Sequence, residues 1–253
     1  MRSIIFGKRT LIELLRDPLS YIFCIGFPLL MLILMSLINE SIPTEANMDV
    51  FQIKNLAPGI AVFGLTFVML FTCLQVSKDR STAFLVRLYA SPIKSEEFIM
   101  GYTYPMILVA ILQCVFTFIT AVIIGSINGY SFNLANIIFC ILVLIPSAIL
   151  FIGIGLFFAT LLSEKAAPGI CSIIITAACM LGGIWMDVDG IGGIIAKVSK
   201  VLPFYHGVTA ARMALNGNYN ELLKPLVIIV MYAVVIYLLA VLIFKRKMQN
   251  DLR

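Results

Sequence analysis

Residues 78–101 hold the side chains of this sequence that are best placed to contact a partner, in a charged segment between two long apolar runs. Arg80 and Arg87 stand seven residues apart on one face of a predicted short helix, and apolar side chains recur on the opposite face. Such a helix catalyses nothing, but an exposed apolar face with a basic edge fits a partner protein or a lipid surface. We therefore interpret residues 78–97 as a docking region, with these candidate contact residues: Asp79, Arg80, Phe84, Leu85, Arg87 and Leu88.

A plain solvated loop between two membrane spans is the alternative for this segment. Ser91-Pro92 ends the predicted helix, because proline disfavours helical geometry in the residue before it. Ser95 can then cap a second helix. A passive connection needs only about 2 to 8 residues, so the length of this segment favours docking.

Other chemistry is scarce in the sequence. His206 is the only histidine, which excludes two-histidine metal sites and histidine-based proteases. Gly7-Lys8 is followed by Arg9 instead of Ser or Thr, and the upstream glycine of a phosphate-binding loop is missing. We expect no catalytic residues, no metal, no cofactor and no ATP hydrolysis by the chain itself.

The composition indicates a membrane protein. Of 253 residues, 61% are hydrophobic and 12% are charged, against roughly 25% charged in soluble domains. One bilayer crossing needs about 20 apolar residues, and the uncharged runs are 18–39, 55–77, 98–163, 166–186 and 225–244. The third run is long enough for two crossings, with turn residues at 125–133. The sequence thus predicts an all-α membrane protein with six transmembrane helices, the first at 19–38 with a kink at Pro28.

The loop charges predict the orientation of these helices, because Lys and Arg collect on the cytoplasmic side. With the N-terminus inside, only a few basic residues lie outside: Lys54, Lys197, Lys200, Arg212 and Lys224. Both termini are therefore expected in the cytoplasm, and the net charge of +5 reflects this bias and not a nucleic-acid surface. The six cysteines fall inside predicted spans, where they indicate packing without disulfides.

Two segments outside the spans read as further helices. In residues 1–17, Arg2, Arg9 and Arg16 recur every seven positions, which indicates a helix on the cytoplasmic leaflet; a plain basic flank of the first span is the alternative. Residues 187–222 are too polar to cross the membrane and too apolar for a free loop. A pair of short re-entrant helices fits them, and an outer loop folded against the membrane is the alternative.

The predicted spans carry no acidic, basic or histidine side chains of the kind that ion-coupled transporters use. The chain has the hydrophobicity of a transporter without its own means of energy coupling. An energy-supplying partner that binds the docking region follows from this.

Two stretches of the sequence are similar to the membrane subunits of ABC-2 type ATP-binding-cassette exporters. Residues 78–101, KDRSTAFLVRLYASPIKSEEFIMG, resemble the segment of that family between spans two and three, although Ser81-Thr82-Ala83 replaces the usual glycine-containing turn. Residues 201–217, VLPFYHGVTAARMALNG, resemble an outer element of the family that places Pro203, Tyr205 and Arg212.

This resemblance implies a single ABC-2 transmembrane domain over residues 1–253, in the plasma membrane of a bacterium. It implies two copies of a separate ABC ATPase that bind the ATP, a coupling helix in residues 78–97, and a second permease subunit in a homo- or heterodimer. The outer element would act as a gate. The cargo would be an amphipathic or hydrophobic drug, antibiotic or peptide, with polysaccharide or lipid as the alternative. An ATP-independent membrane scaffold or sensor remains the rival from another class.

Overall fold

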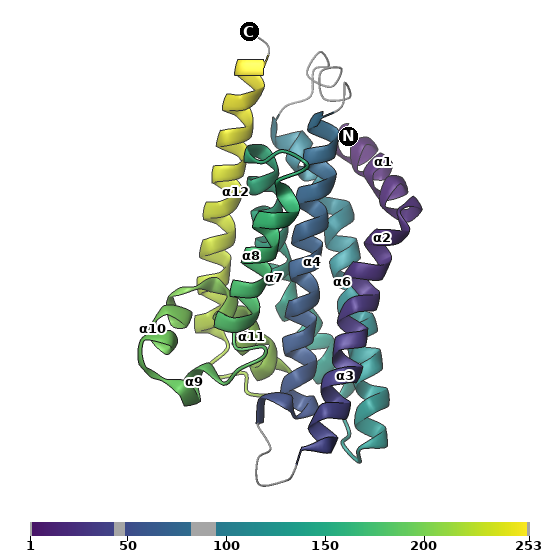
Figure 1. The fold of residues 1–253 in the computed structure, drawn as a ribbon, viewed down its shortest axis with the longest axis vertical. Helices are drawn as coiled ribbons and strands as arrows, with labels where there is room; N and C mark the ends of the chain where they lie inside the picture. Colours follow the sequence, from purple (N-terminus) through teal and green to yellow (C-terminus); the bar gives the residue numbers. More distant parts are fainter. Residues whose placement is uncertain (1, 43–48, 82–94, 252–253) are drawn as a thin grey trace.

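The computed structural model describes residues 2–42, 49–81 and 95–251, and this part of the chain is built of helices without a strand. The long helices run side by side in one bundle, and both termini lie at the same end of it (Figure 1). The elements are α1 (Arg2–Arg16), α2 (Pro18–Tyr21), the π-helical turn η1 (Ile22–Gly26), α3 (Phe27–Ser41), the 3-10 turn η3 (Asp49–Phe51), α4 (Ile53–Ser81), α6 (Ser95–Ile127), α7 (Leu134–Leu161), α8 (Ala167–Leu181), α9 (Val188–Ile191), α10 (Gly193–Val201), α11 (Pro203–Leu215) and α12 (Leu223–Asp251).

Five stretches of the described chain are long and apolar enough to cross a membrane: Pro18–Ser41, Ile53–Arg80, Glu96–Ile127, Leu134–Leu161 and Leu223–Arg246. The predicted fifth span is not among these five, because α8 has only 15 residues and is about 22 Å long at 1.5 Å per residue. Two glycines follow it, and Gly183 has a φ of 75° that few other residues adopt. The apolar run at 166–186 therefore ends in a turn before it reaches the length of a full span.

The first span is irregular near the predicted kink, but the irregularity lies just before the proline. Pro28 has no N–H to bond the carbonyl group of Cys24, four residues earlier. The backbone there forms the π-helical turn η1. Asp17 starts the span by accepting a hydrogen bond from the N–H of Leu19 (3.2 Å) and one from the hydroxyl of Ser20 (2.7 Å).

Helix α4 occupies the middle of the bundle, where it contacts α7, α6, α8, α11 and α3. In the most apolar stretch of 18 residues in α4, 83% of the stretch is buried, whereas in α12 the corresponding share is 17%. Gly155 lets α7 pack closely against the backbone of α4, because a Cβ atom at this position would lie 2.5 Å from the carbonyl oxygen of Met69. Small residues let membrane helices pack at such short range. All six cysteines are buried in the hydrophobic core, the position predicted for packing residues.

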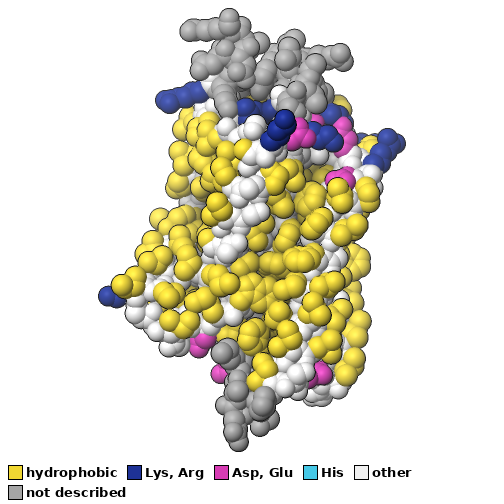
Figure 2. Space-filling model, viewed as in Figure 1, with side chains coloured by type: hydrophobic (Ala, Val, Ile, Leu, Met, Phe, Trp, Pro, Cys, Tyr) yellow, Lys and Arg dark blue, Asp and Glu magenta, His cyan; other side chains and the backbone are white. Residues whose placement is uncertain are grey.

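The outer segment forms the predicted pair of short amphipathic helices, α10 and α11, which lie at the end of the bundle away from the termini (Figure 1). In α10, Ala196 and Ser199 are buried, whereas Ile194 and Val201 are 79% and 66% exposed. Apolar side chains also cover the visible face of the bundle over most of its length (Figure 2). The surface is therefore that of a protein whose surroundings are largely apolar.

The contact at Gly155 predicts a difference between two glycines. Gly155→Ala should destabilise the bundle by about 1 to 3 kcal/mol, because the new methyl group meets backbone that cannot move aside. Gly169→Ala in α8 should stabilise it by about 0.5 to 1 kcal/mol, since a Cβ there meets nothing within 4 Å. Thermal unfolding in detergent, followed by a thiol-reactive dye that labels the buried cysteines as they open, measures both. A Gly155→Ala protein as stable as the parent would contradict this packing.

Candidate functional site

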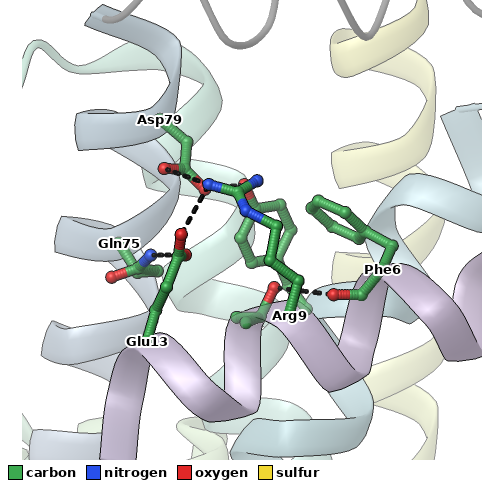
Figure 3. A network of polar contacts seen from close by, with 7 residues as sticks. Phe6, Arg9, Glu13, Gln75 and Asp79 are labelled. Atoms are coloured by element: carbon green, nitrogen blue, oxygen red, sulfur yellow. Dashed lines mark hydrogen bonds and ion pairs between the residues drawn. The ribbon is translucent and has the colours of Figure 1, made fainter. Parts of the chain in front are cut away.

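Asp79, the first residue of the predicted docking set, lies in the last turns of α4 with only 6% of its surface exposed. Its carboxylate accepts a hydrogen bond from the hydroxyl of Tyr102 on α6. Arg9 of α1 approaches the other carboxylate oxygen, with 3.9 Å between Nη2 and Oδ1 (Figure 3). Burial of a charge requires such partners, so Asp79 joins three helices inside the bundle.

Two further residues extend this contact along α1. Arg9 donates a hydrogen bond to Glu13 one turn away (2.6 Å), and the side-chain amide of Gln75 on α4 donates to the other oxygen of Glu13 (3.1 Å) (Figure 3). We call the set of Arg9, Glu13, Gln75, Asp79 and Tyr102 the α1–α4 polar network. It ties α1 to the end of α4 that leads into residues 82–94.

Aromatic packing supports the same junction. Phe6 of α1 meets the ring of Tyr102 edge-on at 4.9 Å between centroids and stacks on Phe98 at 5.4 Å. A Cβ atom at Gly101 would lie 2.2 Å from the Phe6 ring, so the glycine makes room for it. Gly101 is the glycine that closes the sequence stretch singled out above.

Arg80, the second docking candidate, is also engaged within the bundle. Its guanidinium group donates to the carbonyl groups of Ala159 and, at 3.4 Å, Leu162, at the C-terminal end of α7. Cations are favourable at that end of a helix, where carbonyl groups lack partners. Arg80 thus fastens α4 to α7 instead of lying on the free edge of a docking helix. The other candidates, Phe84, Leu85, Arg87 and Leu88, lie outside the described residues.

Arg212 of the outer segment joins three elements at the opposite end of α4. Its guanidinium donates to the carbonyl groups of Asn55 on α4 (3.1 Å) and Gly183 after α8 (2.8 Å). Burial lowers the pKa of Arg212 from the ordinary 12.5 to about 10, so the side chain keeps its charge at neutral pH. The charge is satisfied by backbone carbonyl groups, which makes Arg212 an anchor for α11.

The other two residues of the outer element also shape α11. Pro203 is its first residue, a position that suits the fixed φ of proline. The hydroxyl of Tyr205 donates to Asp189 (2.8 Å), which also pairs with Lys200 at 2.8 Å. The hydrogen bond from Lys200, together with that from Tyr205, holds the pKa of Asp189 below its ordinary value. The Nε2 atom of His206 lies 2.9 Å from the carbonyl oxygen of Lys200, in the last turn of α10, a structural contact.

Within the described residues, no group of His, Cys, Asp and Glu is arranged to hold a metal ion. The contacts described above are structural, because the side chains fix neighbouring helices to both ends of α4. The model of one protein family, the ABC-2 type transporter, matches residues 3–216, which spans α1 to the turn after α11. The chain belongs to the ABC-2 type transporter family. No curated protein matches it.

As an ABC-2 membrane domain, the chain is the transmembrane permease part of an ABC transporter. Sequence reasoning selected Asp79 and Arg80 but missed Glu13, Gln75 and Tyr102. It assigned Arg9 to the leaflet surface, whereas Arg9 lies against Glu13 and Asp79. The i,i+4 spacing of Arg9 and Glu13 on a predicted helix indicates an ion pair between them. Nothing in the sequence paired Tyr102 with a carboxylate twenty-three residues before it.

The hydrogen bond between Tyr102 and Asp79 predicts energetic coupling between the two side chains. Asp79→Asn and Tyr102→Phe should each lower the free energy of unfolding. The double variant should lose about 1 to 3 kcal/mol less than the sum of the two single losses, because both substitutions remove the same charged hydrogen bond. The thiol-dye unfolding assay measures this coupling. As a control, Asp79→Asn combined with Tyr219→Phe, whose hydroxyl bonds Asn136, should be additive. Additive effects for Asp79 and Tyr102 would contradict the network.

Proposed function

We propose that this ABC-2 permease works as one subunit of a bacterial exporter driven by a separate ATPase. The family match carries the proposal, since ABC-2 membrane domains serve ABC transporters. Two permease subunits, identical or related, would form the pathway, and two ATPase copies would bind the ATP. The chain would lie in the plasma membrane as a six-span protein, with α8 as a short fifth span and α10 and α11 as re-entrant helices.

The distribution of charge supports a cytoplasmic position for both termini. Most of the Lys and Arg side chains visible in Figure 2 gather at the end of the bundle that carries the termini. Lys8, Lys78, Lys165 and Lys245 are exposed there. Basic residues of membrane proteins collect on the cytoplasmic side, so we assign this end to the cytoplasm, where ATP is available.

The last turn of α4 and the first turn of α6, which residues 82–94 connect along the chain, lie at this same end. We assign the contact with the ATPase to Phe84, Leu85 and Leu88, with Arg87 at its rim, because apolar anchors dominate protein interfaces. Asp79 and Arg80 would act as positioning residues. They fix the end of α4 to α1, α6 and α7, so a displacement of the docking segment would reach these helices directly.

An apolar groove supports a hydrophobic or amphipathic cargo over a polysaccharide. The groove has a volume of about 460 Å³ and lies among the first span, α4 and α8. Its walls are mainly Phe and Leu side chains, among them Phe23, Phe67 and Phe71, with Ser172 and Thr176 as the polar groups. A sugar chain would leave most of its hydroxyl groups without partners on such walls. Pro203, Tyr205 and Arg212 would govern the exit at the outer end.

The docking assignment predicts a loss of coupling on truncation of two leucines. Leu85→Ala with Leu88→Ala should weaken copurification of the permease with its ATPase and abolish cargo-stimulated ATP hydrolysis, since each central anchor contributes about 2 kcal/mol. Leu238→Ala with Leu242→Ala is the matched control, because both leucines are exposed on α12. The proposal fails if the Leu85 and Leu88 variant assembles, hydrolyses ATP and exports like the parent.

A further inference from the structure

A cleft of about 1030 Å³ opens at the outer end of the bundle, between α10, α11 and the first turns of α12. The helices α10 and α11 and the start of α12, which line it, lie at the end of the molecule away from the termini (Figure 1). The hydroxyl of Tyr232 on α12 donates to the carbonyl group of Val201 (2.8 Å) and so holds α10 against α12 beside it. Of the three residues assigned to the cargo exit, Tyr205 alone lines this cleft, and the occupant of the cleft is a separate question.

Charges of both signs line the polar side of the cleft. Lys200 lines it but is already compensated by Asp189 at 2.8 Å. Lys224 and Glu221 also line it, are exposed, and form no ion pair with any of the residues the structure describes. The uncompensated charges are therefore one ammonium and one carboxylate, three residues apart.

The other side of the cleft is apolar and continuous with a lipid-like surface. Val227 and Ile228 of α12 line it. Further along the same helix, toward its C-terminus, Val230, Val234 and Leu238 are 46%, 53% and 59% exposed. A hydrocarbon chain that leaves the cleft can therefore follow α12 along the length of the bundle. Tyr205 also lines the cleft, and tyrosine is common at membrane interfaces.

We propose that this cleft binds one phospholipid whose headgroup carries both a phosphate and a primary ammonium group. The phosphate accepts hydrogen bonds from Lys224 and from the remaining N–H groups of Lys200, and the ammonium donates to Glu221. The acyl chains lie on Val227, Ile228 and the exposed face of α12. A purely anionic headgroup would leave the carboxylate of Glu221 unpaired beside it, and a quaternary ammonium has no N–H to donate.

Native mass spectrometry of the purified full-length chain tests this site, with dioleoyl phosphatidylethanolamine, phosphatidylglycerol and phosphatidylcholine added in turn. Phosphatidylethanolamine should bind most tightly. Lys224→Ala should weaken its binding about tenfold, because a charge-assisted hydrogen bond is lost. Glu221→Gln should weaken phosphatidylethanolamine but leave phosphatidylglycerol unchanged or tighter. Lys197→Ala, an exposed lysine of α10 outside the cleft, should change nothing.

Three results would overturn the proposal. The first is equal binding of phosphatidylethanolamine by the parent and by both cleft variants, with their folding checked by thermal unfolding. The second is tighter binding of phosphatidylglycerol that depends on Lys224, which would identify an anionic-lipid site. The third is displacement of the lipid by millimolar inorganic phosphate, which would identify a free-phosphate site in which the apolar wall plays no part.

Discussion

The approach of α4 to α7 depends on the absence of a side chain at Gly155, where a Cβ atom would lie 2.5 Å from backbone. In a membrane, the hydrophobic effect does not press helices together, so close packing of this kind supplies much of the association energy. Because α4 also contacts α6, α8, α11 and α3, most of the bundle is arranged around it. A change in the α4–α7 distance would therefore alter the packing of almost every other helix.

Helix α4 is held at both of its ends by polar side chains. At the end near the termini, Asp79 meets Tyr102 and Arg9, and Arg80 meets the end of α7. At the far end, Arg212 bonds the carbonyl group of Asn55 and fixes α11 to the first turns of α4. In the function proposed above, this one helix connects the ATPase contact with the outer gate. Polar contacts concentrated at helix ends cost less desolvation than contacts at the bilayer centre.

Sequence reasoning predicted the helical class and the elements set by local patterns. Asp17-Pro18 starts the first span and Pro203 starts α11, as capping chemistry and fixed φ angles require. The uncharged run at 166–186 is longer than α8, because the absence of charges alone does not register that Gly182 and Gly183 end a helix. The α1–α4 polar network was missed because its members come from three helices. Only tertiary packing brings Tyr102 to Asp79 and gives Arg80 the end of α7 as its partner.

Orientation is the claim on which the whole account depends, since the end that carries the termini must face the ATPase. Single cysteines at Lys197 on α10 and at Lys165 before α8 occupy exposed positions near opposite ends of the bundle. In intact cells, a membrane-impermeant maleimide should label Lys197→Cys, and it should label Lys165→Cys only after the membrane is permeabilised. Labelling of Lys165→Cys in intact cells, with Lys197→Cys protected, would place the network and residues 82–94 outside the cell and contradict the account.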